Sequence, residues 1–250
     1  MKKQAEIAIV IPSHKRAEKI NTHRLLPNNG NVYVCVPESQ VEDYKKHNPE
    51  MNILAHPDTV IGISPNRQWI YDKFGYVFMI DYDIQKISCV YDEKSTSLSP
   101  DQFYEVIQTH YHTCKNNGIY LFGFTSNANP LMYDVFEPIK FSGVIMAGAI
   151  GLLKNPHFRF DPEAPNVDDY LICGINAFYY RKALIDTRFC AVPFKTFHNE
   201  GGLSEYRSLE TEKHDTIYLR KKFGEALNIK KNTAKAKVFH QYQRTLTIPF

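Results

Sequence analysis

Short apolar runs alternate with polar stretches through the first third of the chain. Strands are predicted at residues 7–12, 32–36, 52–55 and 77–80, and these runs, apart from Asn52, are continuously apolar rather than alternating. Continuous runs of this kind are typical of strands that are buried on both faces, as in a parallel sheet. Residues 37–47 and 66–73 are predicted to be helices, the first with Pro37 in its first turn. This alternation predicts an α/β fold with a mostly parallel sheet flanked by helices.

The second half of the chain has a less regular pattern. A helix is predicted at 100–114, where Ser99 precedes it as an N-cap, and the start of another at 168–180. Strands are predicted at 119–124, within 140–153 and at 238–242. The sequence has no internal repeat and no low-complexity linker, so the whole chain, residues 1–250, is predicted to be one domain.

Composition places the chain in a broad class. Hydrophobic residues make up 43% and charged residues 23%, which is ordinary for a soluble globular protein. No apolar stretch approaches the roughly 18 residues of a membrane span, and the apolar run at the N-terminus is too short for a signal peptide. The cysteines are odd in number, scattered and without a CxxC pair, which indicates free thiols in a reducing compartment: Cys35, Cys89, Cys114, Cys173 and Cys190. We expect a cytoplasmic protein, in the host cytoplasm if a phage encodes it.

Positive charge is concentrated near the C-terminus, although the net charge of +3 is modest. Between residues 213 and 244 there are two acids, Asp215 and Glu225, and nine basic residues: Lys213, Arg220, Lys221, Lys222, Lys230, Lys231, Lys235, Lys237 and Arg244. This distribution favours a polyanionic partner or a phosphate-bearing substrate. A solvated, lysine-rich helix face is an equally good explanation.

Two acids, Asp81 and Asp83, follow the apolar run 77–80. Alternate residues of an extended chain share a face, so the two carboxylates can form half of a site for a hard divalent cation, completed by substrate phosphates. Their position at the C-terminal end of a predicted parallel strand is where open α/β sheets bind ligands. The alternative is a turn in which an aspartate caps the next segment.

Three other features are candidates for chemistry. Asp168 and Asp169 are either an N-cap and a first-turn acid of a helix or, if the first acidic pair is functional, the source of a carboxylate base. Arg67, near a predicted helix N-terminus, could reach a diphosphate, hold the carboxylates of the first acidic pair, or be a solvated arginine. His240 is either a packed histidine or a ligand for a metal such as manganese.

These motifs occur in one order along the chain: a strand followed by PSHKR, then GISPNRQW, DYD after a strand, DD, and a C-terminal histidine. Together they resemble the glycosyltransferases of the GT-A fold, over nearly the whole chain. The second acidic motif is Glu-Asp in many relatives and Asp-Asp here, which leaves open which aspartate is the base. Within that fold the sequence looks most like the phage glycosyltransferases that act on modified, hydroxymethylpyrimidine DNA.

The resemblance implies a role for each matching residue. The nucleotide pocket would be bordered by Pro12, Ser13 and Arg16, and the diphosphate would lie beside Asn66 and Arg67. The metal would be bound by Asp83 and His240, with Asp81 near both the metal and the ribose. The base would be Asp169 or Asp168, and Gly148 would approach the donor sugar or the acceptor. Residues 1–95 would form a Rossmann-like half that binds the nucleotide-sugar, and residues 96–250 the acceptor-binding half.

The implied function is metal-dependent transfer of a sugar from a nucleotide-sugar, a UDP-sugar, with Mn²⁺ or Mg²⁺. The acceptor would be a hydroxymethylated or already glycosylated base in double-stranded phage DNA, or else a saccharide or small molecule. No membrane and no obligate protein partner are implied. Two remote alternatives are a nucleotidyltransferase, for which a glycine-rich triphosphate loop is missing after the first strand, and a non-catalytic DNA-binding protein.

Overall fold

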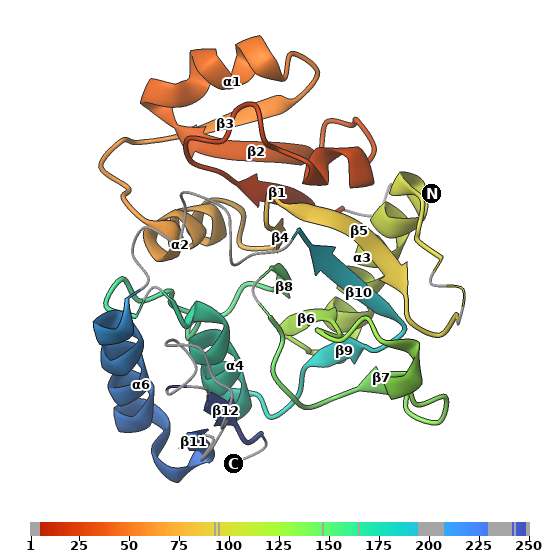
Figure 1. Cartoon of the computed structure of the whole chain (residues 1–250), viewed down its shortest axis with the longest axis vertical. Coiled ribbons are helices and arrows are strands. Elements are labelled where there is room, and N and C mark those ends of the chain that lie inside the picture. The colour runs from red at the N-terminus through yellow and green to blue at the C-terminus, as the bar shows by residue number, and fades with distance from the viewer. Residues whose placement is uncertain are drawn as a thin grey trace.

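The apolar runs of the N-terminal half form neighbouring strands of one sheet. In the computed structural model, which describes residues 6–92, 94, 96–146, 148–164, 166–194, 208–229, 242 and 244–248, they are β1 (Ala8–Pro12), β2 (Val32–Pro37), β3 (Asn52–His56) and β4 (Val77–Ile80). They pair in parallel in the order β3-β2-β1-β4 (Figure 1). Every residue of β1 and β4 is buried, as continuous apolar strands of a doubly covered sheet require.

The second half extends this sheet through an antiparallel strand. β8 (Ala149–Leu152) lies between β4 and β6 (Leu121–Phe124) and runs against both. β9 (Leu184–Asp186) is parallel to β6, and β7 (Ile139–Lys140) closes the edge in the antiparallel sense. The order of the eight strands is β3-β2-β1-β4-β8-β6-β9-β7. The carboxyl ends of β1, β2, β3, β4, β6 and β9 therefore share one edge of the sheet.

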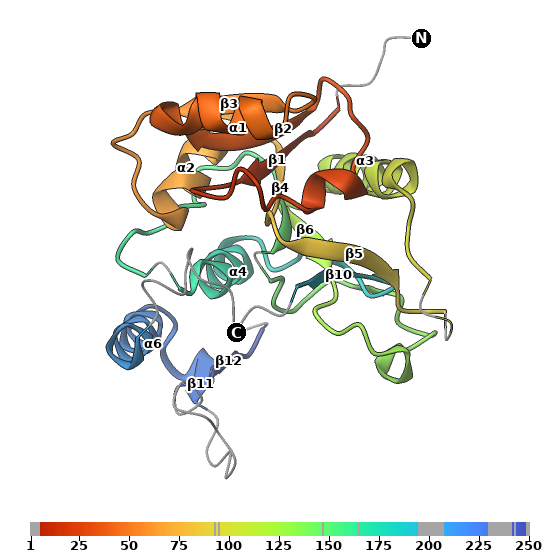
Figure 2. The same cartoon turned by 45° about the horizontal axis from the view of Figure 1, so that its top comes forward.

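Helices cover both faces (Figures 1 and 2). One buried cluster takes residues from α1 (Val41–His47) and α3 (Pro100–Asn117), and the other takes residues from α2 (Ile63–Phe74), α4 (Asp168–Tyr179) and α6 (Leu209–Phe223). The Ser99 side chain and Gln102 form a capping box at the start of α3, which confirms the predicted cap. The short 3₁₀ helices are η1 (Thr22–Leu25), η2 (Glu38–Gln40), η3 (Pro130–Met132) and η4 (Gly224–Ala226).

Two small antiparallel sheets complete the fold. β5 (Ile84–Cys89) pairs with β10 (Phe189–Pro193), and β11 (Leu227–Ile229) pairs with β12 (Arg244–Leu246). The strand predicted at 238–242 lies almost entirely outside the described residues. The boundary predicted between the two halves, at residues 95 and 96, falls between β5 and α3.

The fold class predicted from the sequence, a mostly parallel α/β sheet flanked by helices, is confirmed by this strand order. All five cysteines are free and buried, as their spacing indicated. Within the described part of the chain, no helix has both the length and the hydropathy needed to cross a bilayer.

Candidate active site

The first predicted site residues lie where β1 ends. Pro12 is the last residue of β1, and the next residue, Ser13, donates its N–H to the carbonyl of Cys35 at the end of β2. The Ser13 hydroxyl lies 2.8 Å from the hydroxyl of Tyr44, which also accepts the backbone N–H of Arg16 at 2.9 Å. Tyr44 is completely buried in α1, so this loop is held rigidly at the carboxyl edge of the sheet.

Arg16 itself is a buried cation without a carboxylate partner among the described residues. It is 9% exposed, its guanidinium lies 5.6 Å from the centre of the Tyr82 ring, and its Nε and Nη2 make no hydrogen bond to any described group. Buried guanidinium nitrogens normally have acceptors. An anion is the kind of group that would satisfy them.

The acidic loop, residues 81–83 directly after β4, is held by hydrogen bonds on two sides. The buried Thr22 of η1 donates its hydroxyl to the carbonyl of Asp81 and accepts the N–H of Ile84 at 2.9 Å. Across the sheet, the Asp81 N–H donates to the carbonyl of Gly148 at 3.0 Å, and a Cβ added to Gly148 would lie 3.6 Å from Asp81 Oδ2. Gly148 is thus brought next to the acidic loop, while its predicted approach to the donor sugar or the acceptor stays a prediction. The sequence analysis missed Thr22.

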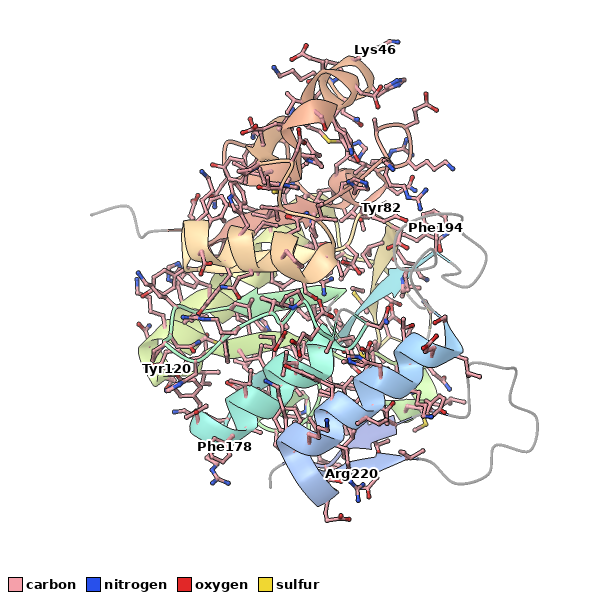
Figure 3. All side chains as sticks on the ribbon, turned by 90° about the vertical axis from the view of Figure 1, so that its left-hand side faces the viewer. Lys46, Tyr82, Tyr120, Phe178, Phe194 and Arg220 are labelled. Atoms are coloured by element: carbon pink, nitrogen blue, oxygen red, sulfur yellow. The ribbon has the colours of Figure 1, made fainter. Side chains whose placement is uncertain are left out.

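The last residue of that acidic loop, Asp83, lies close to the end of β10. Its carbonyl accepts the N–H of Phe194 at 2.9 Å, and Tyr82 and Phe194 lie near each other in Figure 3. Burial, together with repulsion from Asp81, raises the pKa of the Asp83 carboxyl to about 6. The positive charge of Arg16 lowers this pKa, but by less than burial and Asp81 raise it.

Arg67 of α2 joins the two predicted acidic motifs. Its side chain is 5% exposed, and Nη2 donates to Asp81 Oδ1 at 2.8 Å while Nη1 donates to Asp168 Oδ2. Arg67 and Asp168 are 101 residues apart in the sequence, so this contact closes the site between the two halves of the chain. Of the three predictions for Arg67, the contact with the first acidic pair is confirmed for Asp81, the contact with a diphosphate stays a prediction, and the solvated arginine is wrong because the side chain is buried.

Asp168 and Asp169 occupy the first turn of α4 and are both buried. The N-cap of α4 is Val167, so the prediction that one of these acids is the N-cap is wrong. Asp168 accepts Arg67 at Oδ2 and the N–H of Asp169 at Oδ1, at 3.0 Å. Asp169 accepts the N–H of Tyr170 at 2.8 Å, and burial and the neighbouring Asp168 raise the pKa of its carboxyl to about 7.

Arg244 of β12 lies on the other side of Asp169 and was not recognised as a site neighbour. Its guanidinium lies 5.8 Å from the centre of the Tyr170 ring, and its positive charge lowers the pKa of Asp169 against the effects of burial and Asp168. Arg244 is itself paired with the buried Glu212 at 2.8 Å. It therefore does not contribute to a solvent-exposed basic surface.

The remaining predicted site residues are placed as follows. Asn66 is buried in the first turns of α2 and accepts the Cys35 thiol at 3.6 Å. His240 lies outside the described residues. Among the described residues, no group of three His, Cys, Asp or Glu side chains comes together as a metal site, so the acidic loop provides two carboxylates, those of Asp81 and Asp83.

Two basic residues of α6, Arg220 and Lys222, have partners outside this site. Arg220 is paired with Glu225, and Lys222 lies 3.7 Å from Asp161 and over the ring of Tyr218. In Figure 3, Arg220 lies near the bottom of the view and Tyr82 in its upper half. In the described part of the basic C-terminal segment, Arg244 lies beside the acidic site, whereas Arg220 and Lys222 have partners elsewhere.

Comparison with known proteins gives a family match. The sequence model of the family described as TET-Associated Glycosyltransferase matches residues 7–149, more than half of the chain. That region includes β1 to β4, Arg67 and the acidic loop, and it ends before Asp168. Among solved structures, a crystal structure of S. aureus TarS 1–349 is similar at 10% sequence identity and a TM-score of 0.48, covering 86% of this chain and 66% of that chain. No curated protein sequence matches.

Proposed function

We propose that this chain, which belongs to the TET-associated glycosyltransferase family and is therefore a glycosyltransferase, transfers a sugar from a UDP-sugar to a hydroxymethylated or already glycosylated base in DNA. The family assignment sets aside the two remote alternatives, a nucleotidyltransferase and a non-catalytic DNA-binding protein. One observation carries the proposal: Arg67 joins Asp81 at the end of β4 to Asp168 at the start of α4, so the donor-side and acceptor-side acids form one site.

The donor is proposed to bind with its diphosphate near Arg16. The guanidinium is desolvated, two of its nitrogens make no hydrogen bond to described groups, and it lies at the carboxyl edge of the sheet. A diphosphate would provide the missing acceptors, and charge-assisted hydrogen bonds of this type are the strong ones. Pro12 and Ser13 then lie beside the nucleotide as parts of the same loop.

A divalent cation is proposed to bind beside the diphosphate. Asp83 and Asp81 would hold it, with phosphate oxygens as further ligands, and carboxylate and phosphate oxygens are the ligands that Mg²⁺ and Mn²⁺ prefer. The fit is supported by Asp83, whose raised pKa reflects negative charge that no neighbouring cation neutralises fully. When bound, such an ion would offset the charge that develops on the leaving diphosphate.

Asp169 is proposed as the base, and Asp168 as the residue that anchors Arg67. Both oxygens of Asp168 already accept hydrogen bonds, whereas Asp169 accepts one, from Tyr170. A pKa of about 7 is suitable for a general base near neutral pH. The Asp169 carboxylate takes the proton of the acceptor hydroxyl as its oxygen bonds to the anomeric carbon, and the bond from that carbon to the diphosphate breaks. A single displacement of this kind inverts the anomeric centre.

The acceptor is proposed from the family and not from the basic residues of α6, of which Arg220 and Lys222 have partners outside the site. Association with TET in the family description, and the resemblance to phage enzymes that modify hydroxymethylpyrimidine DNA, both support a hydroxymethylated base. A saccharide acceptor is the main competing outcome.

The experiment measures donor binding first and transfer second. Thermal unfolding is followed with a panel of nucleoside diphosphates, with and without Mn²⁺, for the wild type, Asp83→Asn, Asp169→Asn and the exposed control Asp101→Asn. We expect UDP with Mn²⁺ to stabilise the wild type, Asp169→Asn and the control, because a ligand that binds only the folded state raises its stability by mass action. We expect little stabilisation of Asp83→Asn.

Transfer of labelled sugar from UDP-sugars is then measured on matched duplexes containing cytosine, 5-hydroxymethylcytosine or glucosylated 5-hydroxymethylcytosine. We expect transfer to the two modified duplexes by the wild type and the control, and none by Asp169→Asn. Transfer by both active-site variants would refute the residue assignments. Transfer only to saccharides would refute the DNA acceptor while leaving the donor site intact.

A further inference from the structure

Four apolar side chains face solvent between β6 and β7. Leu131 is 90% exposed, Met132 68%, Val135 66% and Phe136 94%, and none of them belongs to either buried cluster. They lie on η3 and in the loop that follows, which is the green loop beside β7 in Figure 1. A contiguous group of exposed apolar side chains on a soluble protein marks an interaction surface.

The same loop forms one wall of a cavity of about 280 Å³. Polar side chains from the end of β6, Thr125, Ser126 and Asn127, form a second wall, and Ser142 contributes from the segment after β7. The Tyr133 ring provides a flat apolar surface. The volume is at the lower end of the range for small-molecule pockets, roughly 300–1,000 Å³, so one ring system fits better than an oligosaccharide.

The cavity lies at the same carboxyl edge of the sheet as the proposed active site, because Thr125 follows β6, Asp81 follows β4, and β8 is the strand between β6 and β4. Val144 lines it, and the N–H of the next residue, Ile145, donates to Cys173 Sγ of α4 at 3.2 Å. Cys173 follows Asp169 by four residues, so the two lie on one face of α4. A few residues further along the same segment, the carbonyl of Gly148 accepts the N–H of Asp81. A group in this cavity is therefore adjacent to the segment that connects both acidic motifs.

The charge of the cavity rim favours a neutral ring with N–H groups over a phosphate. Asp134 and Glu137 line the cavity, and Lys140 is paired with Glu137 at 2.9 Å. Carboxylates repel phosphates but accept hydrogen bonds from the exocyclic amino group of a base. Apolar side chains beside such a cavity have a matching partner in duplex DNA, because they can insert between stacked bases.

We propose that this cavity receives the acceptor base after it has been extruded from duplex DNA, and that the apolar loop 131–136 fills the space the base leaves in the stack. This inference rests on the proposed function, since it assumes a base in DNA as the acceptor. The apolar loop favours a base in duplex DNA over a saccharide, because its side chains can insert between stacked bases. Extrusion takes a few kcal/mol of unstacking and unpairing, and is easiest where pairing is already weak.

The test uses a loop variant, a cavity variant and a surface control. Leu131→Ser with Phe136→Ser removes the two most exposed apolar side chains of the loop, Asn127→Trp obstructs the cavity, and Ile217→Ser changes an apolar side chain that is 46% exposed on α6. The probe is a short duplex with 5-hydroxymethylcytosine beside 2-aminopurine, whose fluorescence rises when its stacking is lost. A second duplex places an abasic site opposite the modified base, and a third substrate is single-stranded.

For the wild type and Ile217→Ser we expect the fluorescence to rise on binding and sugar to be transferred to all three substrates. For the loop variant we expect no rise on the paired duplex and a loss of transfer there of about tenfold or more, with transfer to the abasic and single-stranded substrates changed by less than about threefold. Asn127→Trp should lose transfer to every substrate and retain stabilisation by UDP.

The contrary results separate the two proposals. If the wild type glycosylates DNA and the loop variant matches it on the paired duplex, the base-extrusion inference is wrong and the proposed function survives. The base-extrusion inference is also wrong, and the proposed function survives, if the loop substitutions change the oligomeric state and nothing else. If the wild type binds UDP but glycosylates no DNA substrate, the DNA acceptor and the inference built on it both fall.

Discussion

Replacing Asp169 with asparagine should make the folded protein more stable at alkaline pH while it abolishes transfer. The Asp169 carboxyl is 8% exposed and titrates at about 7 in the folded protein, against about 3.9 in an unfolded chain. Between those two values the unfolded chain releases a proton that the folded protein keeps. Stability therefore falls as the pH rises through this interval and is constant above about pH 7.

The size of the effect follows from that interval. Each pH unit between the two pKa values lowers the free energy of unfolding by about 1.4 kcal/mol, so ionised Asp169 destabilises the fold by at most about 4 kcal/mol at pH 8. Asparagine keeps the acceptor for the Tyr170 N–H but adds an amide N–H₂ group, and leaving that unsatisfied costs about 1–3 kcal/mol. We expect Asp169→Asn to be less stable than the wild type near pH 4 and more stable by about 2 kcal/mol at pH 8.

The assay is urea unfolding of both proteins across pH 4 to 8, followed by the fluorescence of the single tryptophan, Trp69 of α2. Asp101→Asn, an exposed acid at the start of α3, is the control and should show no such pH-dependent crossover. The difference between Asp169→Asn and the wild type should increase with pH and level off above about 7. A difference that stays constant from pH 5 to pH 8 would refute the raised pKa. In the wild type, kcat/KM should rise over the same interval, because the base must be ionised.

Three further substitutions test the structure around the site. Arg67→Met leaves two carboxylates without their shared cation and should lower the free energy of unfolding by about 3 kcal/mol in urea titrations, with Arg67→Lys recovering only part of it. Thr22→Val removes the hydroxyl that holds the acidic loop, and should cost about 1–2 kcal/mol and weaken stabilisation by UDP and Mn²⁺; unchanged nucleotide binding would contradict the role given to this contact. Gly151→Ala would place a Cβ 2.1 Å from the Phe122 ring and should destabilise by about 1–3 kcal/mol or more, whereas Gly30→Ala, with nothing within 4 Å of the added carbon, should change the unfolding midpoint little.

The central strands could be predicted from the sequence because a strand that is buried on both faces needs an apolar side chain at nearly every position. β1 and β4 are buried along their whole length, so each is a continuous apolar run. The predicted bounds of β1 to β4 differ from the observed ones by at most one residue. α3 was predictable because Ser99 and Gln102 form a local capping box. β5 and β10 were missed because they pair with each other outside the main sheet and carry mixed side chains.

The site was predictable in its residue types and less so in its contacts. The sequence shows two pairs of acids next to predicted elements, Asp81 with Asp83 and Asp168 with Asp169. Which role each acid has depends on Arg67, which contacts one acid of each pair although Asp168 is 101 residues away in the sequence. No local pattern indicates such a partner. No local pattern indicates the role of Thr22 of η1 either, because it holds the acidic loop through hydrogen bonds to backbone groups, which any sequence can provide.

The position of the antiparallel strand β8 in the sheet affects how the chain folds while the ribosome synthesises it. β4 and β6 each form hydrogen bonds with β8 and not with each other. The backbone hydrogen-bonding groups on one side of β4 therefore have no partner strand until residue 152 has been synthesised. That strand is the apolar sequence Val-Phe-Met-Ile, without a charge or a proline to protect it. We expect the nascent chain to be most prone to aggregate between the synthesis of β4 and that of β8. Slower translation of this interval should then lower the soluble yield of the enzyme without changing the stability of the finished fold.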